Sequence, residues 1–235
     1  MNAHYFRALA AGFVLACLPA LMSFAADAPA AKSLEEARID KAVQDFIARQ
    51  KADQEKANDQ RVANRMSSLL GDPGTLVLGN PQGDVTIIEF FDYTCPFCKA
   101  MEPRVQQLLK DDKKVRLVVK EFPILRPESI VATKAALASV KQGKYAAYHQ
   151  TMMNFRGQLT EDAIFSMAKD VGLDVERLKK DMTAPEIGDA IIANFNLARA
   201  LRIFDTPTVI IGNHLVTEAS VKIDFPKEVA ALRAK

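Results

Sequence analysis

The sequence predicts an α/β fold in which a strand–helix–strand unit comes first, a helical insertion follows, and two strands and a helix close the chain. Runs rich in β-branched and aromatic residues cover 85–91 and 115–120, with a helical pattern between them. The pattern is then helical from 128 to 202, and strand signals resume at 208–211. Because the first two strands are joined through a helix, we expect them to be parallel.

Composition narrows the class of protein before any motif is considered. The chain has 235 residues, with 31 Lys and Arg against 29 Asp and Glu, and 49% of it is hydrophobic. This is the balance of a globular protein, and it lacks the basic excess that is typical of nucleic-acid binding. Three cysteines are an odd number and too few for a scaffold held by disulfides.

Residues 1–25 have the pattern of a cleavable secretory signal peptide. Arg7 precedes an almost wholly apolar run over 8–22, and small residues follow at Ser23 and Ala25. The run is short for a membrane span, which needs ~20 residues. We therefore expect export to the periplasm.

Cys17 lies inside this apolar run and would leave with the signal peptide. A lipidation site at Cys17 is the weaker alternative, because the run continues past it. Removal of the segment takes one Arg and no acid, so the net charge falls from +2 to +1. The remaining cysteines, Cys95 and Cys98, form one Cys-x-x-Cys pair.

Residues 26–72 are predicted to form an N-terminal helical arm, with a helix over 33–70. Ser33 and Glu36 have the spacing of a capping box, and the middle of the helix, 50–61, is nearly free of apolar residues. We interpret the arm as an oligomerisation segment, since an apolar face must be buried somewhere. Packing of this face on the following domain is the alternative. The apolar positions at helical spacing are Leu34, Ile39, Val43, Phe46 and Ile47.

The α/β fold is expected in two parts, 73–127 and 203–235, on either side of a helical insertion at 128–202. In the first part, Gly and Pro residues at 71–74 end the arm, and a short strand is expected at 75–78. Breaks between the insertion helices are expected at Gly143, Gly157, Gly172 and Pro185.

The second part begins with a predicted hairpin. Gly212 and Asn213 suit a two-residue turn between strands at 208–211 and 214–217, and a helix is expected over 224–233.

The Cys-x-x-Cys pair follows the predicted strand 85–91 and opens a helix. Cys95 is therefore expected at a helix N-terminus, where free N–H groups and the helix dipole stabilise a thiolate. Pro96 suits the first helical position because it has no N–H to satisfy. We expect Cys95 to be the exposed nucleophile and Cys98 to be the resolving thiol.

Two structural interpretations compete with redox chemistry at this pair. A fixed disulfide across four residues constrains little chain, because stabilisation grows with loop length. A zinc site would need further ligands, and only His149 and His214 remain in the mature sequence. His149 has no pattern of partners and is expected to be a solvated helical residue. The sequence favours redox chemistry, with neither a metal nor another cofactor.

Two further residues are candidates for the site. Glu89 lies within a run of Ile and Phe, where burial would raise its pKa and make it a proton acceptor for the resolving thiol. An edge position facing water, or pairing with Lys120, is the alternative. Pro207, preceded by Thr206, is either an ordinary strand-entry residue or the site of a cis peptide bond.

Taken together, these motifs resemble the DsbA family of exported thiol-disulfide oxidoreductases, which have a thioredoxin-like fold with a helical insertion. The resemblance covers about 75–235. It implies that Glu89 is the buried acid beneath the cysteine pair, and that Pro207 is cis and faces the disulfide. The motifs are Ile88-Glu89-Phe90-Phe91-Asp92-Tyr93-Thr94-Cys95-Pro96-Phe97-Cys98, Lys120-Glu121-Phe122-Pro123-Ile124 and Thr206-Pro207-Thr208.

The resemblance also implies how the site meets its substrates. Thr206, Pro207, Pro96 and Phe97 are expected to contact exported proteins that carry cysteines or disulfides, and a membrane-embedded protein is the expected redox partner. The extra arm is similar to that of the oligomeric ScsC-like and DsbG-like branches, and favours a disulfide isomerase that forms a homo-oligomer through 33–70. A DsbA-like oxidase is the first alternative.

One departure from the family bears on the chemistry. The strong oxidase of the family has His before the second cysteine, whereas this chain has Phe97, which offers the thiolate neither charge nor hydrogen bond. We expect the pKa of Cys95 to be lowered within the range of ~3.5–7.5, but not to its lowest end. A copper-binding dithiol protein, assisted by Met66 or Met101, is an alternative of another class.

Overall fold

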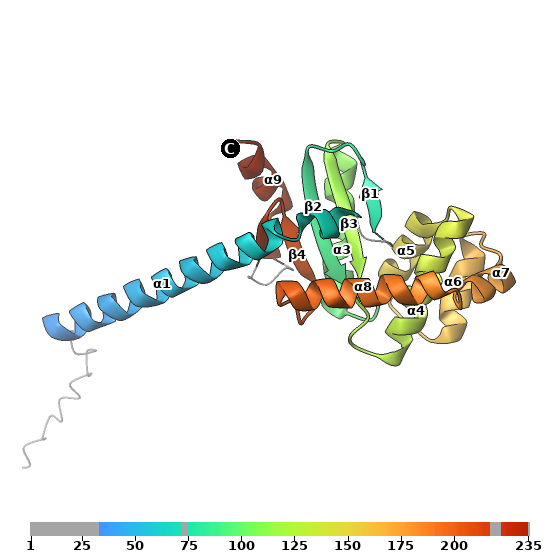
Figure 1. The fold of residues 1–235 in the computed structure, drawn as a ribbon, viewed down its shortest axis with the longest axis horizontal. Helices are drawn as coiled ribbons and strands as arrows, with labels where there is room; N and C mark the ends of the chain where they lie inside the picture. The colour runs from blue at the N-terminus through green and yellow to red at the C-terminus, as the bar shows by residue number, and fades with distance from the viewer. Residues whose placement is uncertain (1–32, 72–74, 217–221, 235) are drawn as a thin grey trace, which may run out of the picture. The chain divides into compact units, whose positions relative to one another are not determined.

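The core of the fold is a mixed five-stranded sheet with the order β1-β3-β2-β4-β5 (Figure 1). The computed structural model describes residues 33–71, 75–216 and 222–234. The strands in it are β1 (Leu76–Gly79), β2 (Val85–Phe91), β3 (Val115–Glu121), β4 (Thr208–Ile211) and β5 (His214–Val216). β2 is the central strand, parallel to β3 and antiparallel to β4, which confirms the predicted βαβ unit and hairpin.

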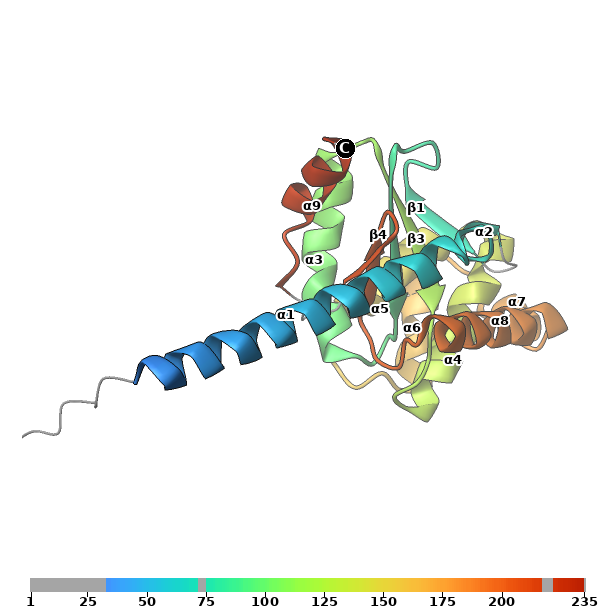
Figure 2. The same ribbon diagram turned by 60° about the vertical axis from the view of Figure 1, so that its left-hand side comes forward.

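Helices α3 (Pro96–Asp111) and α9 (Phe225–Arg233) lie side by side on one face of the sheet (Figure 2). Strand residues alternate in direction, so Ile87, Glu89 and Phe91 point toward α3, while Ile88 and Phe90 point to the opposite face. Glu89 therefore lies on the same side of the sheet as the helix that carries the cysteines.

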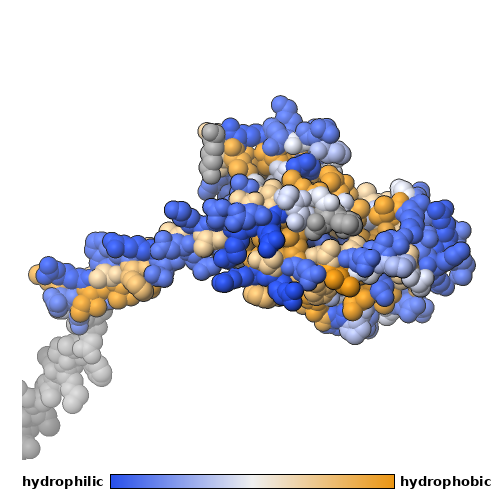
Figure 3. Space-filling model, viewed as in Figure 1, coloured by the Kyte–Doolittle hydropathy of each residue, from blue (hydrophilic) through white to orange (hydrophobic). Residues whose placement is uncertain are grey.

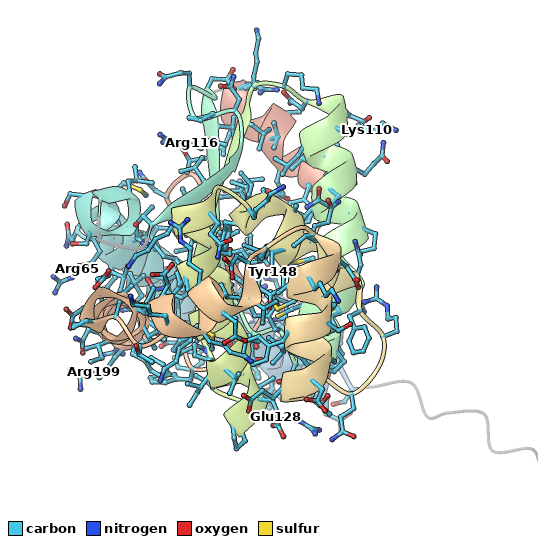
Figure 4. The ribbon with its side chains drawn as sticks, turned by 90° about the vertical axis from the view of Figure 1, so that its right-hand side faces the viewer. Arg65, Lys110, Arg116, Glu128, Tyr148 and Arg199 are labelled. Atoms are coloured by element: carbon cyan, nitrogen blue, oxygen red, sulfur yellow. The ribbon has the colours of Figure 1, made fainter. Side chains whose placement is uncertain are left out.

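The helices between β3 and β4 in the chain occupy the predicted insertion, and most of them form a layer beside α3. The C-terminal half of the last one instead packs on the opposite face of the sheet. Figure 4 shows Tyr148 in the interior of the layer beside α3, where its hydroxyl donates to the Ile164 carbonyl at 2.7 Å. The elements are α4 (Pro127–Ser139), the 3₁₀ turn Val140–Gln142, α5 (Tyr145–Asn154), α6 (Glu161–Asp170), α7 (Val175–Asp181) and α8 (Pro185–Leu201). Left-handed backbone at Gly143 and Gly172 ends helical segments where breaks were predicted.

The N-terminal helix differs from the prediction, because the helix expected over 33–70 is interrupted. It forms as α1 (Leu34–Ala63) and α2 (Met66–Gly71), with a turn at Asn64 and Arg65. Val62 on α1 and Leu69 on α2 belong to one hydrophobic cluster with Ile88, Phe90 and α8 side chains. Both are fully buried, so the helices on either side of the turn contribute to the core.

Packing on the following domain accounts for one part of the arm, and an exposed apolar face remains on the other. The end of α1 and α2 packs on the following domain, as the alternative stated, whereas the apolar residues from Leu34 to Ile47 are exposed. Contacts divide the chain into two compact units, residues 1–45 and residues 46–235. The predicted signal peptide lies outside the described residues. No helix in the described part of the chain is both long and apolar enough to span a membrane.

Candidate active site

Cys95 caps the N-terminus of α3, as the sequence predicts. Its backbone is extended, Pro96 takes the first helical position, and the Cys98 N–H donates to the Cys95 Sγ at 3.4 Å. The Cys95 carbonyl accepts from the Lys99 N–H at 3.1 Å, which is the first bond of the helix. Both cysteines are free thiols. The pair is therefore held so that each sulfur is within reach of the other.

The expectation of an exposed nucleophile was wrong. Cys95 is only 2% exposed and Cys98 is fully buried. The Cys95 Sγ donates to the main-chain carbonyl of Thr206 at 3.3 Å, so the loop before β4 covers it. The Thr206–Pro207 peptide bond is cis, which confirms the second of the two interpretations of Pro207.

The surroundings of Cys95 favour its thiolate. Hydrogen bonding from the Cys98 thiol, with smaller contributions from Thr206 and from the N–H groups of Cys98 and Phe97, lowers the pKa of Cys95 to about 6, against the opposing effect of burial. The Cys98 thiol thus makes the largest contribution to the stability of the thiolate, and the N–H groups at the start of the helix add a smaller one, without a histidine beside Cys95.

Thr206 presents two groups that act on Cys95 in opposite directions. Its carbonyl accepts the S–H bond and so favours the thiol. Its buried hydroxyl has no hydrogen-bond partner among the described residues, and a donor there lowers the pKa of Cys95. The hydroxyl is thus available to the thiolate once the proton has left.

The pKa of Cys98 moves in the other direction. Burial raises it first, and the bond to Cys95 and the nearby charges of Glu89 and Cys95 raise it further. Cys95 is therefore the nucleophile of the pair, and Cys98 needs help to lose its proton.

Glu89 is buried close to the pair, as the resemblance implies. Burial raises the pKa of this carboxyl well above its usual range, and Glu102 and Cys95 raise it further. Its Oε1 has no hydrogen-bond partner in the described structure. The alternative pairing with Lys120 was wrong: Glu89 lies opposite Val119, and Lys120 donates instead to Thr75 Oγ1 at 2.6 Å.

Glu102 is a site residue that the sequence analysis missed. It is 2% exposed, accepts a bond from Gln106 at 2.7 Å, and has a pKa raised by burial. It follows Cys98 by four residues on α3, so both residues share one face of that helix. This spacing was a signal that could have identified it.

Asp92 organises the turn before Cys95 and was also missed. Its Oδ1 accepts from the N–H and hydroxyl of Thr94, at 2.7 and 2.8 Å, and from the Ser129 hydroxyl at 2.7 Å. Its Oδ2 accepts from the N–H groups of Ile124 and Leu125. One fully buried carboxylate thus joins the active-site turn, α4 and the segment after β3.

His149 corrects another expectation, because it is buried rather than solvated. Its Nδ1 lies 2.9 Å from the Tyr93 hydroxyl, and its ring stacks on Tyr145 at 5.5 Å between centroids. Both tyrosine hydroxyls donate to Glu121 Oε1 at 3.0 Å. Burial lowers the pKa of His149 to about 3 and raises that of Glu121 to about 8. The ring of His149 therefore lies in the interior, bonded to Tyr93 of the active-site turn and stacked on Tyr145, which donates to Glu121 of β3.

The surface around Cys95 carries exposed apolar side chains. Phe97 is 60% exposed and Phe204, close to the cis bond in sequence, is 74% exposed. Pro96 is exposed as well. Such residues are suited to contact an extended, partly apolar polypeptide.

The two methionines considered for copper lie in different places. Met101 belongs to the hydrophobic cluster of the cysteines, but Met66 packs on the cluster across the sheet, so it cannot share a site with them. Among the described residues, no group of three or more His, Cys, Asp or Glu could hold a metal ion. Copper binding by the dithiol itself stays a prediction.

Comparison with known proteins agrees with this geometry. A thioredoxin family model matches residues 71–228. The chain is 42% identical to a thioredoxin-like oxidoreductase from Silicibacter pomeroyi DSS-3, with a TM-score of 0.67 over 72% of this chain and 98% of that one. It is 26% identical to the thiol-disulfide exchange protein α-DsbA2 from Wolbachia pipientis, with a TM-score of 0.68 over 76% of this chain and 97% of that one.

Curated relatives include proteins of similar and of much greater length. The chain is 28% identical over 151 residues to the probable disulfide bond formation protein D of Bacillus cereus, which covers 59% of this chain and 70% of that protein. It is 27% and 28% identical over 138 residues to two proteins named Na⁺/H⁺ antiporter NhaA, from Salinispora tropica and Salinispora arenicola, and spans 21% of their length. The matched family model and the cysteine site together show that the chain belongs to the thioredoxin family, among its DsbA-type thiol-disulfide oxidoreductases.

Proposed function

We propose that this protein catalyses thiol–disulfide exchange on exported proteins and acts as an oligomeric disulfide isomerase. The observation that supports exchange is the cysteine pair at the start of α3, with one thiol acidic and the other buried. The observation that supports the oligomer is an exposed apolar face on α1.

In the proposed reaction, the Cys95 thiolate attacks one sulfur of a substrate disulfide. A mixed disulfide forms between them, and the other substrate sulfur leaves as a thiolate. That thiolate can attack a different substrate disulfide, and a later thiolate of the substrate then displaces Cys95. Isomerisation thus leaves the number of disulfides and the redox state of the enzyme unchanged.

When the substrate does not rearrange, Cys98 resolves the mixed disulfide. Its thiolate attacks Cys95, forms the Cys95–Cys98 disulfide and releases a substrate thiol. Glu89 is the proposed proton acceptor for Cys98, because it is the buried carboxyl whose charge acts on that thiol.

The proposed substrate contacts surround the sulfur of Cys95. Thr206 and Pro207 lie on one side of it, since the Thr206 carbonyl is 3.3 Å from Sγ. A substrate chain there would replace the covering contact with main-chain hydrogen bonds of its own. Pro96 and Phe97 offer exposed apolar surface beside it.

The oligomer is proposed to form through the N-terminal half of α1. Ile39, Val43, Phe46 and Ile47 share one side of the helix at about 100° per residue, and each is about half exposed or more, from 49% to 62%. Leu34 lies off this side. Figure 3 shows apolar residues gathered along one side of this half of α1, with hydrophilic residues on the other. A second copy of the same face is the simplest partner, because most oligomers are symmetric.

An oligomer would help an isomerase more than an oxidase. Several Cys95 sites around one substrate raise the effective concentration of thiolate at its remaining disulfides. The compartment proposed for this reaction is the periplasm, with a membrane-embedded reductant keeping the cysteines reduced. The ScsC-like or DsbG-like placement stays a prediction.

The test is to charge the apolar face of α1 and to measure both mass and isomerase activity. The variant Ile39→Glu/Val43→Glu/Phe46→Glu should yield a monomer by light scattering and should lose most of the activity on scrambled ribonuclease. The matched control is Ala37→Glu/Gln44→Glu/Ala48→Glu, which adds the same charge to the opposite, exposed side of α1. Wild-type protein that is already a monomer, or a monomeric variant that isomerises as well as wild type, would contradict the proposal.

Substitution is a sharper test than truncation of the whole arm. A chain beginning near Gly71 would lack Val62 and Leu69, which are fully buried against the sheet. Loss of activity in such a chain would report damage to the core as much as loss of the oligomer.

One observation favours the oxidase instead. A thiolate with a pKa of about 6 stabilises the reduced form of the pair and so makes its disulfide more oxidising. The two functions separate in one comparison: an oxidase restores reduced ribonuclease faster than it repairs scrambled ribonuclease, and it is found mostly oxidised in the periplasm.

A further inference from the structure

A cavity of about 640 Å³ opens beside Cys95, on the side of the helical insertion. Thr94 and Pro96, the two residues that flank Cys95 in sequence, both line it. The rest of its wall comes from α3, from the start of α4 and from 155–159, the loop between α5 and α6. A chain joined to Cys95 by a disulfide therefore passes close to this cavity.

The charged residues that line the cavity are mostly cations. Lys99, Arg126 and Arg156 contribute three positive charges, and Glu128 is the one carboxylate among the lining residues, so the net charge of the wall is +2. Figure 4 shows Glu128 pointing outward from the first turn of α4. The chain as a whole has a net charge of only +2, so this excess is local.

Lys99 is held in place by the main chain of the insertion. Its Nζ donates to the Met152 carbonyl at 2.5 Å and to the Phe155 carbonyl at 2.9 Å, both at the C-terminal end of α5. An ammonium group has three donors, so one remains for a ligand. A cation fixed in this way costs less entropy to use than a free surface lysine.

Arg156 is fixed in a similar manner. Its Nη1 donates to the Met153 carbonyl at 2.8 Å and its Nη2 to the Lys99 carbonyl at 3.3 Å. These bonds use neutral acceptors, so the positive charge of the guanidinium is not cancelled by them. Arg126 is exposed at the N-cap of α4.

Lys99 is partly buried next to another cation. Burial, together with the charge of Arg156, lowers its pKa to about 8, although Cys98, Asp92 and Glu102 act in the opposite direction. Partial burial next to a like charge is unfavourable for an ammonium unless a counter-charge arrives. A carboxylate placed in the cavity would supply it.

We propose that this cavity binds an acidic side chain of the substrate polypeptide, close in sequence to the cysteine that reacts with Cys95. Glutamate or aspartate near that cysteine would be drawn toward Lys99, Arg126 and Arg156, and would hold the neighbouring sulfur at Cys95 Sγ. The inference rests on the exchange step of the proposed function, but not on isomerisation or on the oligomer.

The test uses short peptides with one cysteine, activated as a mixed disulfide with 2-thiopyridine. The Cys95 thiolate attacks the peptide sulfur, the peptide–thiopyridine S–S bond breaks, and thiopyridone is released and measured by its absorbance. Cys98 then forms the disulfide with Cys95 and frees the peptide thiol. Three peptides of equal length carry Glu, Gln or Lys on both sides of the cysteine, and each rate is divided by the rate of that peptide with dithiothreitol.

We expect the corrected rate for the Glu peptide to exceed that for the Gln peptide by about tenfold at low salt, with the Lys peptide slowest. The preference should shrink in 0.5 M NaCl because salt screens it. In Arg126→Gln/Arg156→Gln the ratio of Glu to Gln rates should fall most of the way toward one, because only the charge of Lys99 remains among the three cations, and Arg126→Lys/Arg156→Lys should keep most of it.

The matched control is Lys110→Gln, which removes a cation from the other end of α3 (Figure 4) and should leave the ratio at its wild-type value. Equal corrected rates for the three peptides in wild type, or a preference that the double Gln variant keeps undiminished, would overturn the proposal. Failure of every peptide to release thiopyridone would instead refute exchange at Cys95.

A small thiol with carboxylates could supply the same chemistry. Oxidised glutathione is therefore compared with its ethyl ester, in which the carboxylates are blocked. A preference for free glutathione, without any preference among the peptides, would overturn the assignment to a polypeptide and assign the cavity to a small thiol.

Discussion

The Sγ of Cys95 lies 3.3 Å from the main-chain carbonyl oxygen of Thr206, 111 residues further along the chain. The thiol donates to this carbonyl, while the hydroxyl of the same threonine is buried without a partner in the described part of the chain. Loss of the proton turns the carbonyl contact from favourable to unfavourable and gives the hydroxyl an acceptor. The contacts of Thr206 with Cys95 therefore differ between the thiol and the thiolate.

Replacing Thr206 by Val should raise the pKa of Cys95. The variant keeps the shape of the side chain but removes the donor to the thiolate, and a hydrogen bond to a charged group is worth ~1.5 kcal/mol or more, which corresponds to roughly one pH unit. Thiolate absorbance measured across pH should show a midpoint near pH 6 in wild type and a higher midpoint in the variant. Thr206→Ser retains the hydroxyl and should titrate like wild type; an unchanged midpoint in Thr206→Val would rule out this role.

Substitution of the two cysteines should separate attack from resolution. Cys95→Ser should abolish exchange, because Cys98 is buried and its pKa is raised. Cys98→Ser should accumulate mixed disulfides with substrates, visible as reducible bands on non-reducing gels. A Cys95→Ser variant with wild-type activity would refute the assignment of the nucleophile.

Replacing Glu89 by Gln should slow the resolving step. The amide fills the same space but cannot accept the Cys98 proton, and general-base effects predict a loss of roughly a hundredfold. Stopped-flow release of a peptide from the mixed disulfide would measure this step. In wild type its rate should rise with pH as Glu89 ionises, and in Glu89→Gln this rise should be absent. Glu102→Gln is the informative control. It removes a charge that raises the pKa of Glu89, so the rise should move to lower pH and keep its height.

His149 should make the fold sensitive to acid. Its pKa is about 3 in the folded protein against 6.5 as the ordinary value, so the unfolded chain binds the proton first. This contribution to stability is complete above pH 6.5 and is lost as the pH falls toward 3. Between pH 7 and 4.5, the free energy of unfolding should fall by roughly 2–3 kcal/mol more in wild type than in His149→Phe.

Urea unfolding at the two pH values would measure this difference. The raised pKa of Glu121 acts in the opposite direction, since it adds stability as the pH falls from 8 toward 4.5, but it is common to both proteins. Identical slopes in wild type and His149→Phe would show that the buried ring is not the acid-sensitive group.

The elements that carry local signals could be predicted from the sequence. The run Val85–Phe91 formed β2 with the predicted bounds, and Cys95 and Pro96 took the predicted positions at the start of α3. These features depend on patterning and on capping within a few residues. The cis bond before Pro207 left two interpretations open in the residues alone, and only the resemblance decided between them.

What the sequence did not predict depends on contacts between distant segments. Asp92 gathers donors from as far away as Ser129, and His149 is buried because Tyr93 reaches it across 56 residues. The cover over Cys95 comes from Thr206 in the same way. No periodic pattern marks such residues, because their burial is decided by the packing of whole elements rather than by their neighbours in sequence.

The burial of Val62 and Leu69 limits how far the arm could be shortened during evolution. Val62 and Leu69 seal the face of β2 opposite the cysteines, so the root of the helix belongs to the hydrophobic interior. The fold itself would tolerate loss of the exposed part of α1, although this loss would remove the proposed oligomer surface. Loss of the whole segment would in addition expose Ile88 and Phe90, so the root of the arm cannot be separated from the enzyme.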